Sequence, residues 1–142
     1  MTPDPLTSPR PVRIEPEEAG PAERLQRLLS DFVERVDGVR GIAVADKSGL
    51  PVTSSFSNRA NILTVTAMST MVMQSSQRVY RNLGLEGPSD VVMVGPDSTV
   101  FVSAAAGAQL SIIVVLEGFA NLGLVRIEVD RLSREVAEIL AI

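Results

Sequence analysis

The sequence predicts an α+β sandwich, a fold in which a five-stranded antiparallel sheet lies between helices. Three observations predict it. Three segments carry apolar residues at helical spacing, and five shorter segments have the pattern of strands. Short turns join strands that follow one another, which suits antiparallel pairing. The last strand, Gln109–Leu116, becomes apolar at consecutive positions, so both of its faces should be covered.

The chain length is consistent with one domain that follows a tail. The chain has 142 residues, which suits a single domain. Residues 1–20 hold five of the nine prolines and too few apolar residues to offset the entropy of ordering. We therefore expect a disordered proline-rich tail over 1–20 and one folded domain over 21–142.

A helix and a hairpin are predicted at the start of the domain. Pro21–Val36 has proline at the first helical position, where its missing N–H costs nothing, and it carries one apolar stripe. Val39–Asp46 and Leu50–Ser55 follow as two strands, and Gly49 in their turn suits a positive φ. Pro51 cannot donate a hydrogen bond to a neighbouring strand, so the second strand should lie at an edge of the sheet.

A long helix without charges is predicted next, over Asn58–Leu83. Ser57 or Asn58 can cap its start, and Gly84 suits the left-handed residue that ends many helices. No charged residue stands between positions 59 and 78, whereas a helix with a solvent face normally carries charge there. At 100° per residue, one apolar face is expected to pack on the sheet, consisting of Val65, Met68, Val72, Val79 and Leu83.

Three strands and a final helix complete the predicted domain. Asp90–Gly95 and Thr99–Ala105 are joined by a tight turn, with Pro96 at its second position. The small residues of Ala104–Ala108 form a corner before the last strand, where backbones can come close. Asn121–Ile142 carries the last apolar stripe at helical spacing.

The composition argues against an enzyme. The chain has no histidine and no cysteine, which removes the commonest general base, the commonest metal ligand and the thiolate nucleophile. No phosphate-binding glycine motif and no acidic pair stand out, so we expect no catalytic residue, no cofactor and no metal.

The charge and hydropathy patterns also limit the expected partners and location. The net charge is −4 and no basic stripe lies beside aromatic residues, so nucleic acid is not an expected partner. No segment is apolar enough to span a membrane, and the N-terminus lacks the pattern of a secretory leader. We therefore expect no membrane insertion and a cytoplasmic location.

With catalysis, cofactors and nucleic acid not expected, the sequence favours a surface that associates with another protein chain. Asp90–Gly95 is uncharged after its first residue and rich in valine, and a free edge of this kind is normally protected by lysine or proline. Pairing with its own copy across a two-fold axis would cover it and would bring the long helix beside its copy. We therefore expect a homodimer interface on the strand and on small or pliable helix side chains: Val91, Val92, Met93 and Val94, with Ala60, Ala67 and Met71.

Several segments resemble the Roadblock family, which is named for a dynein light chain. The resemblance spans about residues 22–140. It is carried by Gly38–Ser55 (GVRGIAVADKSGLPVTSS), by the uncharged helix Ile62–Val79, by the strands DVVMVG and LSIIVVL, and by Phe119–Val136 (FANLGLVRIEVDRLSREV). The Asp-x-x-Gly-Leu-Pro-Val of the first hairpin and the Asn-Leu-Gly-Leu-Val-Arg of the last helix are its most specific parts.

The resemblance implies a profilin-like sandwich, a homodimer with one shared sheet, and a small Ras-like GTPase as partner in signalling or cell polarity. Bacterial members of the MglB type bind such a GTPase with two protomers, across the paired central helices. They stimulate hydrolysis without an arginine of their own. Matching the long helix puts the partner contact on Thr66, Thr70, Met73 and Gln77, with Arg59 and Arg81 at its ends.

Two other interpretations stay open. The chain could be a structural adaptor that binds motor or membrane-complex subunits in any nucleotide state. It could also be a small-ligand sensor, since related sandwiches hold ligands between a long helix and the sheet. The sensor interpretation predicts a buried polar pocket near Ser75 or Ser103.

Overall fold

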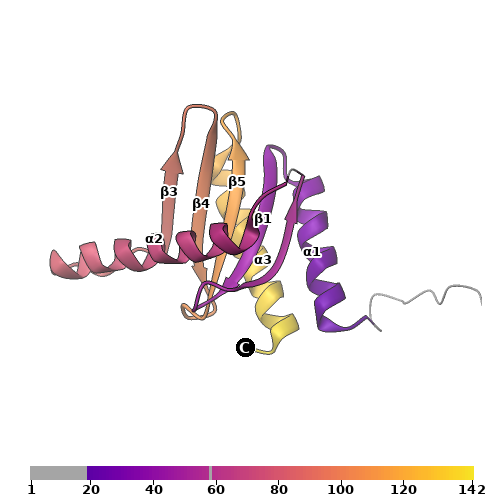
Figure 1. Cartoon of the computed structure of the whole chain (residues 1–142), viewed down its shortest axis with the longest axis horizontal. Coiled ribbons are helices and arrows are strands. Elements are labelled where there is room, and N and C mark those ends of the chain that lie inside the picture. Colours follow the sequence, from indigo (N-terminus) through magenta and orange to yellow (C-terminus); the bar gives the residue numbers. More distant parts are fainter. Residues whose placement is uncertain (1–18, 58) are drawn as a thin grey trace, which may run out of the picture.

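The computed structural model describes residues 19–57 and 59–142 of the chain (Figure 1). Three helices and five strands follow one another in the predicted order. Their bounds are α1 Pro21–Arg35, β1 Val39–Asp46, β2 Pro51–Phe56, α2 Ile62–Asn82, β3 Asp90–Val94, β4 Ser98–Ala105, β5 Leu110–Glu117 and α3 Leu122–Leu140. The predicted tail over 1–20 lies outside the described residues, except for its last two.

All five strands form one antiparallel sheet, in the order β2-β1-β5-β4-β3. β5 is the middle strand, as its unbroken apolar run predicts. β2 is an edge strand, which confirms the expectation drawn from Pro51. Gly49, in the turn between β1 and β2, has a φ of 88°, the left-handed conformation predicted for it. The other edge is β3.

The first face of the sheet is covered by α1 and α3. Their predicted apolar stripes meet residues of β1, β4 and β5 in one core. Phe32 of α1 and Phe101 of β4 are its largest fully buried side chains. The core members are Leu25, Leu29, Phe32, Val36, Ile42, Val44, Phe101, Ala105, Leu110, Ile112, Val114, Leu116, Val125, Val129, Leu132 and Val136.

The second face is covered by α2 alone, which crosses the strands and contacts all five of them (Figure 1). The buried apolar cluster under α2 is much smaller than the first core. It consists of Ala45, Met73, Val102 and Ile113.

The two ends of α2 differ in how well they were predicted. α2 begins at Ile62, later than expected, because the Asn61 side chain accepts a hydrogen bond from Thr64 N at 3.2 Å and caps the helix there. The Ser57 hydroxyl instead donates to the carbonyl oxygen of Arg40 at 2.9 Å, and position 58 lies outside the described residues. Gly84 follows the helix with a φ of 72°, which confirms its predicted conformation.

The face that α2 turns to the sheet is not the predicted one. Met68, Val79 and Leu83 were expected to pack on the sheet, but they are 58, 57 and 66% exposed. Val65 and Val72 are half-buried. The buried residues of the helix are Thr66, Ser69, Thr70 and Met73.

A physical reason for this rotation lies in the sheet. Ala45, Ala104 and Ser111 stand side by side on neighbouring strands, and such small side chains let short hydroxyl side chains of α2 come close. The Thr66 hydroxyl forms a hydrogen bond within the helix, because it donates to the carbonyl oxygen of Ile62 at 3.0 Å. Thr66 can therefore be buried at little cost.

Candidate partner-binding surface

The outer edge of β3 is free. β3 pairs with β4 on one side and with no other described strand. Gly95 N donates to Ser98 O, and Ala104 N donates to Ser89 O, each at 2.8 Å. Because hydrogen-bonded pairs alternate along an antiparallel ladder, odd-numbered residues of this strand bond to β4. The outward-facing N–H and C=O groups then belong to Asp90, Val92 and Val94.

α2 runs past this free edge. Figure 1 shows its C-terminal turns projecting beyond β3. One flank of the helix carries apolar side chains that the sheet does not cover. We call them the exposed stripe of α2: Met68, Val79 and the C-cap residue Leu83, with half-buried Val72 between them. Contact with a second apolar surface would remove this stripe from water, which is favourable.

Two residues at the end of α2 enlarge the apolar surface, and sequence reasoning did not single them out. Tyr80 and Leu85 are both exposed, and Leu85 N donates to the carbonyl oxygen of Tyr80 at 2.9 Å. The sequence signal was available, since both are apolar and lie close to Gly84, past the last turn that the sheet can cover.

The predicted dimer residues on β3 lie at the free edge but differ in exposure. Val91 and Met93 pack on the α2 side of the sheet, and Val92 packs on the side of α1 and α3. Val94 is 81% exposed. The strand can therefore pair with a partner strand through its backbone, while three of its side chains remain packed within their own protomer.

Two of the three predicted dimer residues near α2 are open to solvent, and the third is partly covered. Ala60 and Met71 are exposed, and Ala67 is half-buried. A Cβ placed on Gly49 would lie 3.1 Å from the Cα of Ala67. The close approach that this small side chain permits is therefore made by the chain's own β1–β2 turn.

The residues predicted to contact a GTPase do not share one surface: three of them are buried against the sheet, and the others are not. Thr66, Thr70 and Met73 are 0, 5 and 4% exposed and face the sheet, so these three do not form an outer surface, because α2 is rotated as described above. Gln77 is half-buried, and Arg59 and Arg81 are exposed. Arg59 precedes the 21-residue helix α2 and Arg81 lies in its last turn, and a helix of this length is about 30 Å long.

Ion pairs among the described residues lie away from α2. Arg40 donates two hydrogen bonds to the Glu117 carboxylate, at 2.6 and 2.7 Å. This hydrogen bonding lowers the pKa of Glu117 and raises the pKa of Arg40. Arg35 donates to Glu128 at 2.6 Å across α1 and α3, and it lowers the pKa of Glu128 in the same way. None of the ion pairs found among the described residues includes a residue of α2.

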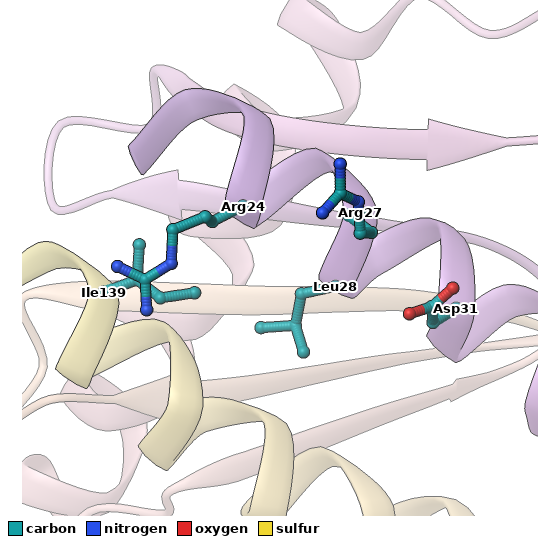
Figure 2. Close-up of a pocket in the computed structure, with 5 residues that line it drawn as sticks. All are labelled: Arg24, Arg27, Leu28, Asp31 and Ile139. Atoms are coloured by element: carbon teal, nitrogen blue, oxygen red, sulfur yellow. The ribbon is translucent and has the colours of Figure 1, made fainter. Parts of the chain in front are cut away.

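A shallow groove lies between α1 and α3 (Figure 2). Leu28 and Ile139 form its apolar floor, and both are half-buried. Arg24, Arg27 and Asp31 of α1 line it, and its volume is about 180 Å³. With charged side chains of both signs and no unpaired strand edge, it offers a weaker case for association than the end of α2.

The residues predicted to flank a ligand pocket have other surroundings. Ser75 is exposed on α2. The Ser103 hydroxyl donates to Asp90 Oδ1 at 2.8 Å, in a hollow of about 380 Å³ between β3, β4 and α3. This hollow is on the opposite side of the sheet from α2, so it is not the predicted space between the long helix and the sheet.

Neither a cluster of metal-binding residues nor a membrane-spanning helix occurs in the described parts of the chain. Within residues 19–57 and 59–142, no group of three or more histidine, cysteine or acidic residues could hold a metal ion. None of the described helices is both long and apolar enough to cross a membrane.

Comparison with known proteins finds both sequence and structural relatives. Residues 25–117 match the family model of the Roadblock/LC7 domain. An uncharacterized protein of Methanocaldococcus jannaschii is 29% identical over 113 residues, which cover 79% of this chain and 92% of that protein.

Solved structures with the same fold include two of MglB. The gliding protein MglB of Thermus thermophilus is 19% identical with a TM-score of 0.73, covering 85% of this chain and 91% of that one. A structure of MglB with a tetrameric arrangement is 18% identical with a TM-score of 0.75, covering 85 and 90%. Identities this low show a shared fold.

Proposed function

This chain belongs to the Roadblock/LC7 family, and from that premise we propose that it is a homodimeric, non-catalytic regulator that binds a small Ras-like GTPase in the cytoplasm. One observation carries the proposal: the free edge of β3 and the uncovered apolar end of α2 occur at the same side of the sheet. A single partner copy could cover both.

Self-association is supported by the geometry of this edge. The outward groups of Asp90, Val92 and Val94 can pair with the same groups of a second copy across a two-fold axis, which extends the sheet. The projecting turns of α2 would then pass over the partner. Its exposed stripe would then be available to the partner's α2.

The GTPase role is supported by the family resemblance and by the absence of charged residues between Arg59 and Arg78. Family members of the MglB type act on a GTPase without supplying a catalytic arginine. A surface that docks and repositions needs no histidine, cysteine or metal. On this chain the contact would use residues at and around α2 that the sheet does not bury: Arg59, half-buried Gln77 and Arg81, together with Met71, an exposed side chain near the middle of the helix.

Light scattering on a β3 variant tests the dimer. Val94→Pro removes an N–H that faces outward and leaves the β3–β4 ladder and the core unchanged. We expect a mass of twice 15.2 kDa for the parent chain and 15.2 kDa for the variant. Val94→Thr keeps the N–H and should remain dimeric. A monomeric parent at micromolar concentration would overturn the dimer.

Titration with a purified Ras-like GTPase from the same organism tests the partner. The GTPase is loaded with GDP in one arm and with a non-hydrolysable GTP analogue in the other. We expect at least about tenfold tighter binding of the GTP form, a difference of ~1.4 kcal/mol. Arg81→Glu should weaken binding, whereas Arg134→Glu on α3 should not. Equal affinity in both arms would contradict the regulator and favour the structural adaptor.

A further inference from the structure

A small cavity lies between α2 and the ends of the strands, beside the turns that join β1 to β2 and β4 to β5. We call it the Thr70 cavity. Its volume is about 120 Å³, whereas one water needs only about 10–15 Å³. The lining residues are Lys47, Thr70, Met73, Gln74, Gln77, Ala104, Ala108 and Ser111.

The sequence explains why the sheet leaves space here. Ala104 of β4 pairs with Ser111 of β5, and Ser111 pairs with Ala45 of β1. This row of small side chains continues the row of Val102 and Ile113, whose larger side chains pack in the cluster under α2. The hollow is therefore produced by a local change from large to small residues.

Thr70 supplies a buried polar atom without a partner. Its Oγ1 has no hydrogen-bond partner among the described residues, although the residue is only 5% exposed. In contrast, the hydroxyl of Thr66, one turn earlier, donates a hydrogen bond to the carbonyl oxygen of Ile62. Buried polar atoms are normally paired, so the Thr70 hydroxyl is a group that a bound molecule could satisfy.

The corner between β4 and β5 holds backbone strain next to the same cavity. Ala106, Gly107 and Ala108 all have positive φ, at 51, 64 and 70°. Alanine rarely adopts this conformation, and such outliers gather at functional sites. Ala108 lines the cavity directly, so the strain shapes one of its walls.

The polar groups around the cavity share one electrostatic character. Lys47 brings the only formal charge of the lining, and no acidic residue belongs to it. No ion pair of Lys47 is found within the described parts of the chain. Two amide groups, from Gln74 and Gln77, and two hydroxyl groups, from Thr70 and Ser111, add donors.

We propose that the Thr70 cavity binds a small oxyanion, a carboxylate or a phosphate, through Lys47, Thr70 and the amide groups of α2. An ammonium and several neutral donors around a space of this size suit such a ligand. The site is separate from the β3 edge and from the exposed stripe of α2. It therefore does not depend on the dimer. Gln77 is shared with the proposed GTPase contact, but oxyanion binding can be measured on this chain without the GTPase.

Nuclear magnetic resonance of the full ¹⁵N-labelled chain tests the site. The protein is titrated with sodium phosphate in one arm, sodium acetate in a second, and sodium chloride at equal ionic strength in a third. We expect saturable shifts of the side-chain NH₂ signals of Gln74 and Gln77 with at least one oxyanion and none with chloride. Phosphate and acetate arms then show which oxyanion the cavity prefers.

Variants separate a built site from general attraction to a cation. Lys47→Gln should weaken oxyanion binding about tenfold or more, since a charge-assisted hydrogen bond is lost. Arg78→Gln removes an exposed cation from α2 that does not line the cavity, and it should leave the affinity for the oxyanion unchanged. Lys47 is exposed, so its substitution should not disturb folding. Shifts that match those of chloride, or that survive Lys47→Gln, would overturn the proposal.

Discussion

The two faces of the sheet differ in how much apolar surface they bury and in which side chains do so. The α1/α3 face buries large apolar side chains such as Phe32, Phe101 and Ile112, and the ion pair of Arg35 with Glu128 joins its two helices. The α2 face has a four-residue buried cluster, short hydroxyl side chains and apolar groups left in solvent. The difference suggests that one face provides the stability of the domain, while the other leaves contacts for a partner.

A substitution on each face would test this division of roles, and it carries the largest expected effect. Phe32→Ala should lower the free energy of unfolding by about 3–5 kcal/mol, because it removes a fully buried ring and leaves a cavity. Met71→Ala on the outer side of α2 should change it by less than about 0.5 kcal/mol. Urea unfolding measures both, and comparable losses would contradict the comparison.

A matched pair of substitutions on α2 sharpens the comparison, with an intermediate effect. Thr70→Val should raise the free energy of unfolding by about 1 kcal/mol in the ligand-free protein, because it replaces a buried hydroxyl without a partner. Thr66→Val should bring no such gain, since that hydroxyl already donates within the helix. Thermal unfolding in a buffer of sodium chloride and an amine avoids added oxyanions. A destabilised Thr70→Val would show that the hydroxyl is satisfied.

The smallest effect is expected at the ion pair of Arg40 and Glu117, which joins the strands β1 and β5, as a dependence of stability on pH. The Arg40 hydrogen bonds hold the pKa of Glu117 below its ordinary value of 4.5, so this pair stabilises the fold above that pH and its contribution is lost as the pH falls. Arg40→Gln should therefore slightly lower the midpoint of urea unfolding at pH 7 and leave it unchanged at low pH.

A control variant belongs to this pH measurement. The pair of Arg134 and Asp130 is far more exposed, with side chains 77% accessible on both sides, and such pairs contribute little. Arg134→Gln should leave the urea midpoint unchanged at both pH values. A loss for Arg40→Gln that is equal at both pH values would point to packing of the arginine stem instead of the ion pair.

Prediction from sequence succeeded where one face of an element is clearly apolar and the other clearly charged. The stripes of Pro21–Val36 and Asn121–Ile142 and the central position of β5 are of this kind, and all are confirmed. α2 has no charged face, so charge does not show which of its faces is turned to solvent. The sequence favours packing of its most apolar face on the sheet, whereas the buried residues are Thr66, Ser69, Thr70 and Met73.

By itself, the sequence determined the number, order and type of the elements, the edge position of β2 and the absence of histidine and cysteine chemistry. These follow from local spacing, turn residues and composition. Only the tertiary structure decided the rotation of α2, the use of Ala67 by the turn at Gly49 and the cavity at Thr70. These depend on which side chains of distant strands lie beneath the helix, because close packing there is a matter of matching sizes that no single segment encodes.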